Sequence, residues 1–247
     1  MKEKIHLIMP MAGAGSRFSK DGYREPKPLI KILDKPFFYW STMSIKKYVD
    51  IQDLVFIVLQ QHIDEFKIDK EIKKYFPEAK IVIIPEVLNG AVLTCLKAKK
   101  EINDNFPVVF NDCDHIFYCS KFNEFANSGK FEKIDGALLT FKSDDPKFSY
   151  LELDNNENVI KTVEKQVVSN YAICGAYYFK NFSIFENIAE TYLQNCQYKE
   201  FFVSGIYNIM AKQDMKIKNF AVDEHLAFGT PEEYKEAVKS SQFERLK

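Results

Sequence analysis

The amino-acid sequence predicts an α/β fold: a mostly parallel sheet flanked by helices, with a small antiparallel extension in the second half. Strand-like and helix-like segments alternate from residue 4 to residue 110. The segment Leu54–Leu59 is apolar throughout, as expected of a parallel strand that is buried on both faces. Residues 136–179 contain four strand-like segments with no helix-like segment between them. In such a fold, ligands bind at the carboxyl ends of the parallel strands.

The elements of the first half follow from apolar runs and amphipathic patterns. A charged amphipathic pattern predicts a helix over residues 62–75, and Asp34-Lys35-Pro36 is typical of a turn. The predicted strands cover residues 5–10, 29–32, 54–59, 81–84 and 108–110, and the predicted helices cover residues 37–48, 62–75 and 91–102.

The elements of the second half are bounded by turn and capping residues. Asp154-Asn155-Asn156 predicts a turn between two strands. A last helix should begin after Thr230, because Thr230 suits the N-cap, Pro231 the first helical position and Glu233 a capping box. The predicted strands cover residues 136–141, 150–153, 159–163, 173–179 and 217–221, and the other helices cover residues 183–193 and 203–212.

Length and composition exclude several classes of protein. The 247 residues contain no Pro/Gly/Ser-rich linker, so we expect a single domain over residues 1–247. With 34 basic and 35 acidic residues, the net charge of -1 gives no support for binding nucleic acid or an anionic membrane. No apolar run is long enough for a membrane span and no signal-peptide pattern is present, so we expect a cytoplasmic protein. Five unpaired cysteines and four scattered histidines predict free thiols and no zinc site.

The loop after the first strand has the features of an anion-binding site. Gly13 and Gly15 let the backbone turn sharply, so that its N–H groups can converge on phosphate oxygens. Arg17 and Lys27 add positive charge, and the prolines on both sides of Lys27 favour an extended backbone there. The spacing fits neither a Walker A loop nor the dinucleotide-binding fingerprint.

Carboxylates follow two of the predicted strands. Asp112-Cys113-Asp114 comes directly after the strand at residues 108–110, and Asp223 follows the strand at residues 217–221. Carboxylate oxygens at the carboxyl end of a strand, beside bound phosphates, are suitable ligands for Mg²⁺. A helix cap or a tight loop would also explain Asp112 and Asp114.

These motifs together resemble the signature of the nucleotidyltransferases that make nucleotide-activated sugars and alcohols. The signature here is Ala12-Gly13-Ala14-Gly15-Ser16-Arg17-Phe18, followed by Pro26-Lys27-Pro28-Leu29 and Asp34-Lys35-Pro36. The resemblance implies a Rossmann-like fold of the nucleotide-diphospho-sugar transferase type. Residues 1–120 would form its nucleotide-binding half and residues 121–247 its acceptor-binding half.

The resemblance also assigns roles to residues. Asp114, before His115-Ile116-Phe117, matches the metal-binding position. Sugar pyrophosphorylases have a second aspartate where this chain has Ala227, so we expect Asp223 to supply it from slightly upstream, or the second ligand to be missing. Asn89 can equally cap a helix, and Glu164-Lys165 can equally be a surface ion pair. The matching nucleotide-binding residues are Met11, Ala12, Gly13, Ala14, Gly15, Ser16, Glu86, Asn89, Gly90 and Ala91, and the acceptor-binding residues are Glu164, Lys165, Gly175 and Tyr177.

The implied reaction is attack of an acceptor phosphate on the α-phosphorus of a nucleoside triphosphate, with release of pyrophosphate. Lys27 would contact the α-phosphate, Arg17 the departing pyrophosphate, and Mg²⁺ at Asp114 the bridging oxygens. Because Ala12 replaces the usual glycine, CTP is the favoured donor. The favoured acceptor is phosphoglutamine or phosphocholine in capsule or surface-polysaccharide modification.

Three other interpretations stay open. The first is a sugar-1-phosphate nucleotidyltransferase that uses UTP, dTTP or GTP. The second is a glycosyltransferase of the GT-A type that uses Asp112-Cys113-Asp114, and the third is a non-catalytic nucleotide-sensing relative, suggested by Ala227. The sequence also leaves open whether the protein forms a homo-oligomer.

Overall fold

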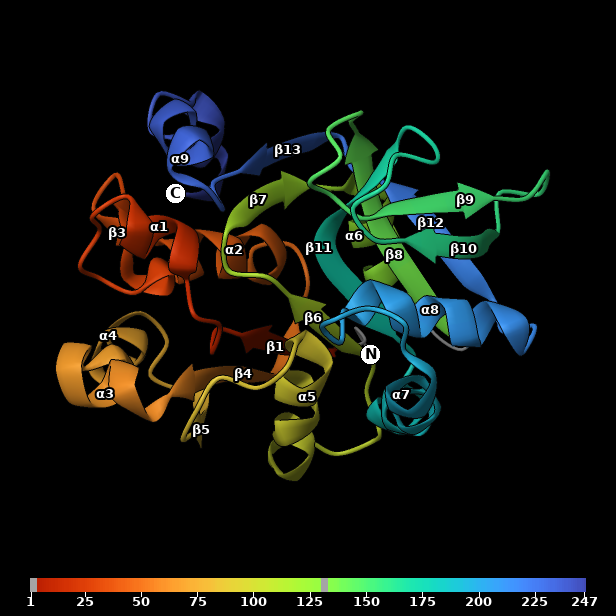
Figure 1. Cartoon of the computed structure of the whole chain (residues 1–247), viewed down its shortest axis with the longest axis horizontal. Coiled ribbons are helices and arrows are strands. Elements are labelled where there is room, and N and C mark those ends of the chain that lie inside the picture. The colour runs from red at the N-terminus through yellow and green to blue at the C-terminus, as the bar shows by residue number, and fades with distance from the viewer. Residues whose placement is uncertain (1–3, 130–132) are drawn as a thin grey trace.

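A nine-stranded mixed sheet forms the centre of the computed structural model, which describes residues 4–129 and 133–247 (Figure 1). Strands β5, β4, β1 and β6 lie side by side and run parallel. Strand β11 pairs antiparallel with β6 and also carries the β8–β12 pair and the β9–β10 hairpin. The strands are β1 (Ile5–Pro10), β4 (Ile51–Leu59), β5 (Lys80–Ile84), β6 (Val108–Asn111), β8 (Gly136–Lys142), β9 (Tyr150–Leu153), β10 (Val159–Val163), β11 (Tyr171–Phe179) and β12 (Ile217–Ala221).

Helices cover both faces of this sheet because successive strand side chains point to opposite sides. In β1, Leu7 and Met9 belong to the core on one face and Ile8 belongs to the core on the other. The first core includes residues of α2 (Phe37–Lys46), α3 (Gln60–Phe66), α4 (Ile68–Tyr75) and α6 (Ser120–Asn127). The second includes residues of α5 (Ala91–Leu96), α7 (Phe182–Asn195) and α8 (Val203–Lys212), with the 3-10 turn η2 (Lys97–Glu101) following α5.

A third core joins the two ends of the chain. Phe18, Phe37 and Trp40 pack with Phe228 and Phe243. As a result, the C-terminal segment lies against the loop that follows β1, and α9 appears near α1 in Figure 1. The elements of this region are α1 (Ser16–Lys20), η1 (Lys27–Leu29), β2 (Lys31–Ile32), β3 (Lys35–Pro36), β7 (His115–Tyr118), β13 (Glu224–Ala227), α9 (Pro231–Ala237) and η4 (Ser241–Leu246).

The predicted fold class and most predicted elements are confirmed, and three predictions were wrong in detail. The predicted helix over residues 62–75 is two helices, because Lys67 adopts a left-handed backbone with φ of 55° between them. The segment at residues 29–32 is not one strand: a 3-10 turn, Lys27–Leu29, precedes the short strand Lys31–Ile32, so Lys27 is not extended. The predicted helix at residues 91–102 ends in the 3-10 turn Lys97–Glu101.

Five of the described helices and strands, each two to eight residues long, were not predicted. They are α1, β3, β7, α6 and β13. No helix in residues 4–129 and 133–247 is long and apolar enough to cross a lipid bilayer.

Candidate functional site

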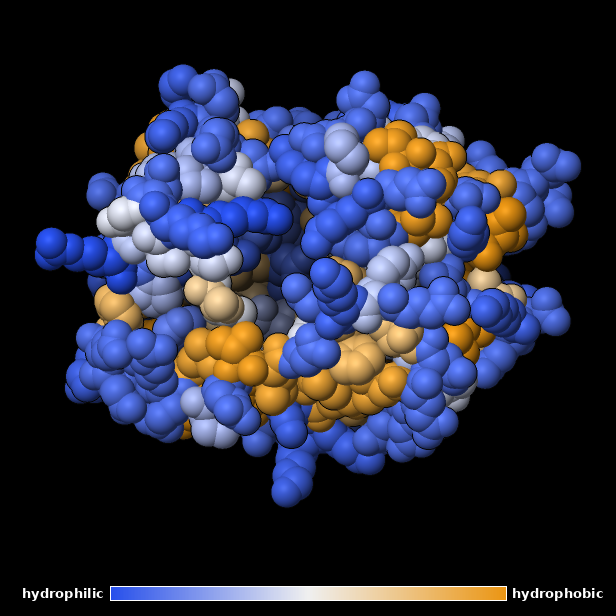
Figure 2. Space-filling model, viewed as in Figure 1, coloured by the Kyte–Doolittle hydropathy of each residue, from blue (hydrophilic) through white to orange (hydrophobic). Residues whose placement is uncertain are grey.

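Three adjoining cavities lie at the carboxyl ends of β1 and β6, beside residues 173–177 of the antiparallel strand β11. From β1, the chain continues through the glycine loop towards β4, on one side of the sheet centre, while β6 lies on the other side. A crevice therefore opens where the loops after β1 and β6 diverge. Figure 2 shows the surface hollowed near the centre of the view, between the positions of α1 and β11, with mostly hydrophilic side chains around the opening.

The first cavity, here called the glycine-loop cavity, has a volume of about 460 Å³. The backbone at Gly90 forms one wall with a φ of 101°, and it is held by the chain at Phe201. Phe201 N–H donates to the carbonyl of Asn89 at 3.3 Å, and Val92 N–H donates to the carbonyl of Phe201 at 3.1 Å. The predicted nucleotide-binding residues that line this cavity are Ala12, Gly13, Ala14, Gly15, Ser16, Asn89, Gly90 and Ala91.

Two residues predicted to bind the nucleotide lie elsewhere. Met11 is buried and lines the second cavity. Glu86 is exposed and lines none of the described cavities, whereas its neighbours Val87 and Leu88 line the glycine-loop cavity. The segment at residues 87–91 thus lines the glycine-loop cavity, and Glu86 does not.

The second cavity, here called the Lys27 cavity, has a volume of about 170 Å³ and contains a half-buried ion pair in its wall. Lys27 Nζ donates to Asp114 Oδ2 at 2.8 Å. Burial opposes the positive charge of Lys27, but Asp114 outweighs burial and raises the pKa of Lys27. In the same way burial opposes the negative charge of Asp114, and Lys27 lowers the pKa of Asp114. Both groups are therefore charged at neutral pH.

Asp112 lacks such a cation. Burial, and after it the negative charge of Asp114, raises the pKa of Asp112 to about 7. The absence of a side chain at Gly175 makes room for it, since a Cβ there would lie 2.7 Å from Asp112 Oδ2. Gly175 has a φ of 89°, and its carbonyl accepts a hydrogen bond from Asp112 N–H at 2.9 Å.

The two carboxylates could contribute to a cation site only together with a ligand. Within the described residues, no three His, Cys, Asp or Glu side chains converge in a way that could hold a metal ion. Mg²⁺, however, is typically bound by one or two carboxylates plus phosphate oxygens of a substrate. Asp112, a carboxylate whose charge no neighbouring cation offsets fully, and Asp114 beside it fit that donor set.

The third cavity, here called the Glu164 cavity, has a volume of about 220 Å³ and shares Asp112 and Asp114 with the Lys27 cavity. The hydroxyls of Ser149 and Ser204 both donate to Glu164 Oε2, the latter at 3.2 Å, and fix this carboxylate. Gly175 and Tyr177, two of the predicted acceptor-binding residues, also line this cavity.

Arg17 and Lys165 do not lie where the sequence analysis expected them. Arg17, predicted beside the departing pyrophosphate, lines the Glu164 cavity rather than the Lys27 cavity. Lys165 is exposed and lines none of the described cavities; its Nζ lies 5.0 Å from the centre of the Phe202 ring.

The structure does not bring Asp223 to Asp114. Asp223 is exposed, and its carboxylate accepts a hydrogen bond from Ser120 N–H at 2.6 Å, at the start of α6. In the β7–β13 ribbon, Ala227 lies opposite His115, next to Asp114. Asp223 precedes Ala227 by four positions, and in an extended chain four positions span roughly 13 Å. Ala227, the position at which the resemblance implies a second aspartate, thus carries a methyl group instead of a carboxylate.

Two histidines that the sequence analysis did not select line the Glu164 cavity. His115 and His225 have ring centroids 5.6 Å apart. Burial lowers the pKa of His115 to about 4 and that of His225 well below its usual range, so both rings are neutral at pH 7. Within the described residues, neither ring nitrogen of His115 has a hydrogen-bond partner. Both lie in four-residue strands that were not predicted, and only the pairing of β7 with β13 brings the two rings together.

Two further cations were missed. Arg24 and Lys27 line a cavity of about 190 Å³ between the glycine loop and α3. Lys147 lines the Glu164 cavity. Arg24 lies only three residues before Lys27, so its position in the sequence could have indicated a role at this site. Lys147 lies in a polar segment without a recognisable motif.

Comparison with known proteins identifies the family of this chain. The family model described as "Nucleotidyl transferase" matches residues 6–242. No curated protein matches the sequence.

Three solved structures share the fold. A nucleoside-diphosphate-sugar pyrophosphorylase from Vibrio cholerae RC9 is 21% identical with a TM-score of 0.81, covering 95% of this chain and 100% of that one. A candidate glucose-1-phosphate thymidylyltransferase from Bacillus anthracis is 18% identical with a TM-score of 0.77, covering 95% and 94%. An inositol-1-phosphate CTP transferase from T. maritima is 15% identical with a TM-score of 0.76, covering 100% and 95%. Because the family match spans nearly the whole sequence, the chain belongs to the nucleotidyl transferase family and is a nucleotidyltransferase.

Proposed function

We propose that this nucleotidyltransferase transfers a nucleoside monophosphate from a nucleoside triphosphate to the phosphate of a small acceptor molecule. CTP is the favoured donor, so the transferred group would be CMP. The observation that carries this proposal is the Lys27–Asp114 ion pair. It lies in the wall of a central cavity that adjoins the glycine-loop cavity on one side and the Glu164 cavity on the other. The base and ribose would occupy the glycine-loop cavity, the α-phosphate the Lys27 cavity, and the acceptor the Glu164 cavity.

The reaction needs no protein nucleophile. A phosphomonoester has its second pKa near 6, so the acceptor phosphate is mostly a dianion at pH 7. One of its oxygens attacks the α-phosphorus, the bond from the α-phosphorus to the bridging oxygen breaks, and pyrophosphate leaves with that electron pair. The protein positions the two anions in line and stabilises the negative charge of the transition state. Lys27 would do this at the α-phosphate, while the backbone of residues 13–15 would bind the other phosphates.

Asp112 and Asp114 would hold Mg²⁺ when the triphosphate is bound. A divalent cation at this place would offset the charge of the phosphate oxygens. The raised pKa of Asp112 supports this role, because a bound cation would replace the stabilisation that its carboxylate lacks. Arg17, which lines the Glu164 cavity, would contact the acceptor side of the reaction.

We favour a phosphorylated non-sugar acceptor, such as phosphocholine or phosphoglutamine in surface-polysaccharide modification. The support is the alanine at position 12, which resembles cytidylyltransferases. A sugar 1-phosphate used with UTP, dTTP or GTP is the second candidate. It is favoured by Glu164, because a carboxylate fixed by two serine hydroxyls is well placed to accept hydrogen bonds from sugar hydroxyls.

The decisive experiment measures pyrophosphate release with Mg²⁺. CTP, UTP, GTP, ATP and dTTP are each combined with phosphocholine, phosphoglutamine and a panel of sugar 1-phosphates. Release with CTP and a non-sugar acceptor supports the favoured assignment, and release only with a sugar 1-phosphate establishes the second candidate. Triphosphate binding without turnover on the whole panel would contradict both.

A further inference from the structure

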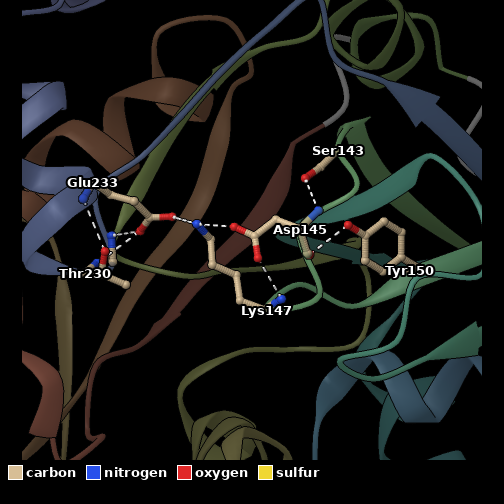
Figure 3. Close-up of polar contacts among 7 residues, drawn as sticks. Ser143, Asp145, Lys147, Tyr150, Thr230 and Glu233 are labelled. Atoms are coloured by element: carbon tan, nitrogen blue, oxygen red, sulfur yellow. Dashed lines mark hydrogen bonds and ion pairs between the residues drawn. The ribbon is translucent and has the colours of Figure 1, made fainter.

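Of the two cations that the sequence analysis missed, one has a partner within the protein and the other has none. The ammonium of Lys147 lies 2.8 Å from Asp145 Oδ2 and 2.9 Å from Glu233 Oε1, so the protein itself offsets its charge (Figure 3). Within residues 4–129 and 133–247, no carboxylate pairs with the guanidinium of Arg24 and no hydrogen bond engages it. The charge of Arg24 is therefore available to an anionic ligand.

Arg24 lies on the cavity of about 190 Å³ between the glycine loop and α3, here called the Arg24 cavity. Lys27 and the two glycines of the loop line both this cavity and the Lys27 cavity, so the two adjoin. Among the described residues, none lines both the Arg24 cavity and the Glu164 cavity. The Lys27 cavity thus has the Glu164 cavity on its Asp114 side and the Arg24 cavity on its glycine-loop side.

This order of cavities matches the geometry of an in-line displacement. The attacking and leaving oxygens of such a reaction lie on opposite sides of the phosphorus. With the α-phosphate in the Lys27 cavity and the acceptor in the Glu164 cavity, the leaving pyrophosphate would point towards the glycine-loop side. The base and ribose take the glycine-loop cavity in the proposed function, so the Arg24 cavity is left for the β- and γ-phosphates.

The segment that carries Arg24 is anchored on both sides. The ring of Tyr23 packs edge-on against those of Phe18 and Tyr234, with centroids 5.1 and 5.9 Å apart. Tyr23 N–H also donates to the carbonyl of Phe18 at 3.1 Å. On the other side, Lys27 is held by its ion pair. The backbone at Arg24 is therefore fixed at the cavity, while its exposed side chain can adjust to a ligand.

The other side chains of the Arg24 cavity favour weak rather than tight binding of an anion. Glu25 and Glu65 also line it and balance the charges of its two cations. Burial lowers the pKa of His62, which lines the same cavity, so this ring is neutral at pH 7. A lining without net charge suits a product that must leave after each turnover.

We propose that Arg24 binds the β- and γ-phosphates of the nucleoside triphosphate, and the pyrophosphate that they form when the bond to the α-phosphorus breaks. The ligand class is a polyphosphate anion, whose oxygens a guanidinium can bind through two parallel N–H groups. This inference rests on the proposed function, because it names a residue that holds the leaving group in the same site. Arg24 would add to the contacts of the loop backbone and keep the leaving group in line with the acceptor.

The test compares Arg24→Ala with Lys20→Ala as the matched control. Lys20 is an exposed cation four residues earlier that lines none of the described cavities. By calorimetry with Mg²⁺, Arg24→Ala should bind the donor triphosphate, CTP first, roughly 5- to 50-fold more weakly, as expected for a lost charged hydrogen bond. The affinity for the matching monophosphate, CMP, should stay within about twofold, because CMP lacks the two phosphates that Arg24 would contact. Lys20→Ala should leave both affinities near wild type.

A kinetic readout adds the product. In the reverse direction, Arg24→Ala should raise the KM for pyrophosphate by a similar factor and leave the KM for the nucleotide-activated product nearly unchanged. Arg24 is exposed, so the unfolding midpoint of Arg24→Ala should stay close to wild type.

Three results would overturn the inference: unchanged triphosphate affinity in Arg24→Ala, an equal loss for triphosphate and monophosphate, or an equal loss in Lys20→Ala. If wild type binds the triphosphate but releases no pyrophosphate with any acceptor, the proposed function fails. The comparison of triphosphate with monophosphate then decides the role of Arg24 by itself.

Discussion

Replacing Gly90 by alanine should destabilise the protein and weaken triphosphate binding together. The backbone at Gly90 has φ of 101° and ψ of 164°, a region that residues with a side chain rarely adopt. A Cβ there would lie 2.4 Å from the nitrogen and 2.6 Å from the oxygen of Phe201, both backbone atoms that cannot rotate away.

The magnitude follows from strain and lost hydrogen bonds. The backbone strain costs about 1–3 kcal/mol. The two hydrogen bonds of Phe201, to Asn89 and Val92, are broken when the backbones separate, and each contributes about 1 kcal/mol. Since 1 kcal/mol shifts the unfolding midpoint of a domain of this size by about 2–4 °C, we expect a decrease of roughly 6–20 °C.

The assay is differential scanning calorimetry of wild type, Gly90→Ala and Gly22→Ala, followed by triphosphate titration. Gly22 is the matched control, because its φ is 88° but a Cβ there would meet nothing within 4 Å. Gly22→Ala should therefore show a strain effect only, about 1 kcal/mol. Equal midpoints for the two variants would refute the argument from the close approach to Phe201.

Four other substitutions test the glycine loop and the charged centre. Gly13→Ala should keep the unfolding midpoint, since a Cβ there meets nothing within 4 Å, yet weaken triphosphate binding in calorimetry if phosphates approach this backbone. Lys27→Ala and Asp114→Asn should each lower kcat for pyrophosphate release on the order of 10²-fold or more while circular dichroism stays native; near-normal kcat would exclude a charge-stabilising role. Asp112→Asn should raise the unfolding midpoint at pH 8. A carboxylate whose pKa rises on folding to about 7 binds a proton more tightly in the folded protein, so its ionisation destabilises the fold as pH rises from about 4 to 7. The gain should shrink at pH 5, where the folded wild type is protonated, and an equal gain at both values would contradict the assigned pKa.

The sequence predicted those features that local rules determine. The alternation of strands and helices, the capping box at Thr230 and the glycine loop all depend on residues close together in the chain, and the structure has each of them. The adjacency of Lys27 and Asp114 was also within reach, because both follow strands whose carboxyl ends share one edge of the sheet.

The parts that could not be predicted depend on distant pairing. Asp223 was expected near Asp114, but the four-residue strand β13 places it at the other end of a ribbon, and only the register of β7 and β13 determines this. Lys165 was expected among the acceptor-binding residues, but its side chain is exposed and its Nζ lies over the ring of Phe202. Lys147 acquires its partner Glu233 from a helix more than eighty residues later, and no local pattern signals such a pair.

The third core has a consequence for synthesis of the protein. Phe18, Phe37 and Trp40 lie in the first forty residues, yet Phe228 and Phe243 are needed to cover them. A ribosome adds about 5–20 residues per second. Phe228 and Phe243 are therefore synthesised roughly 10–40 s after Trp40. During that interval the nascent chain presents apolar aromatic surface beside the glycine loop, a suitable target for a chaperone. Pairing of β13 with β7 comes equally late, because β13 also lies near the end of the chain.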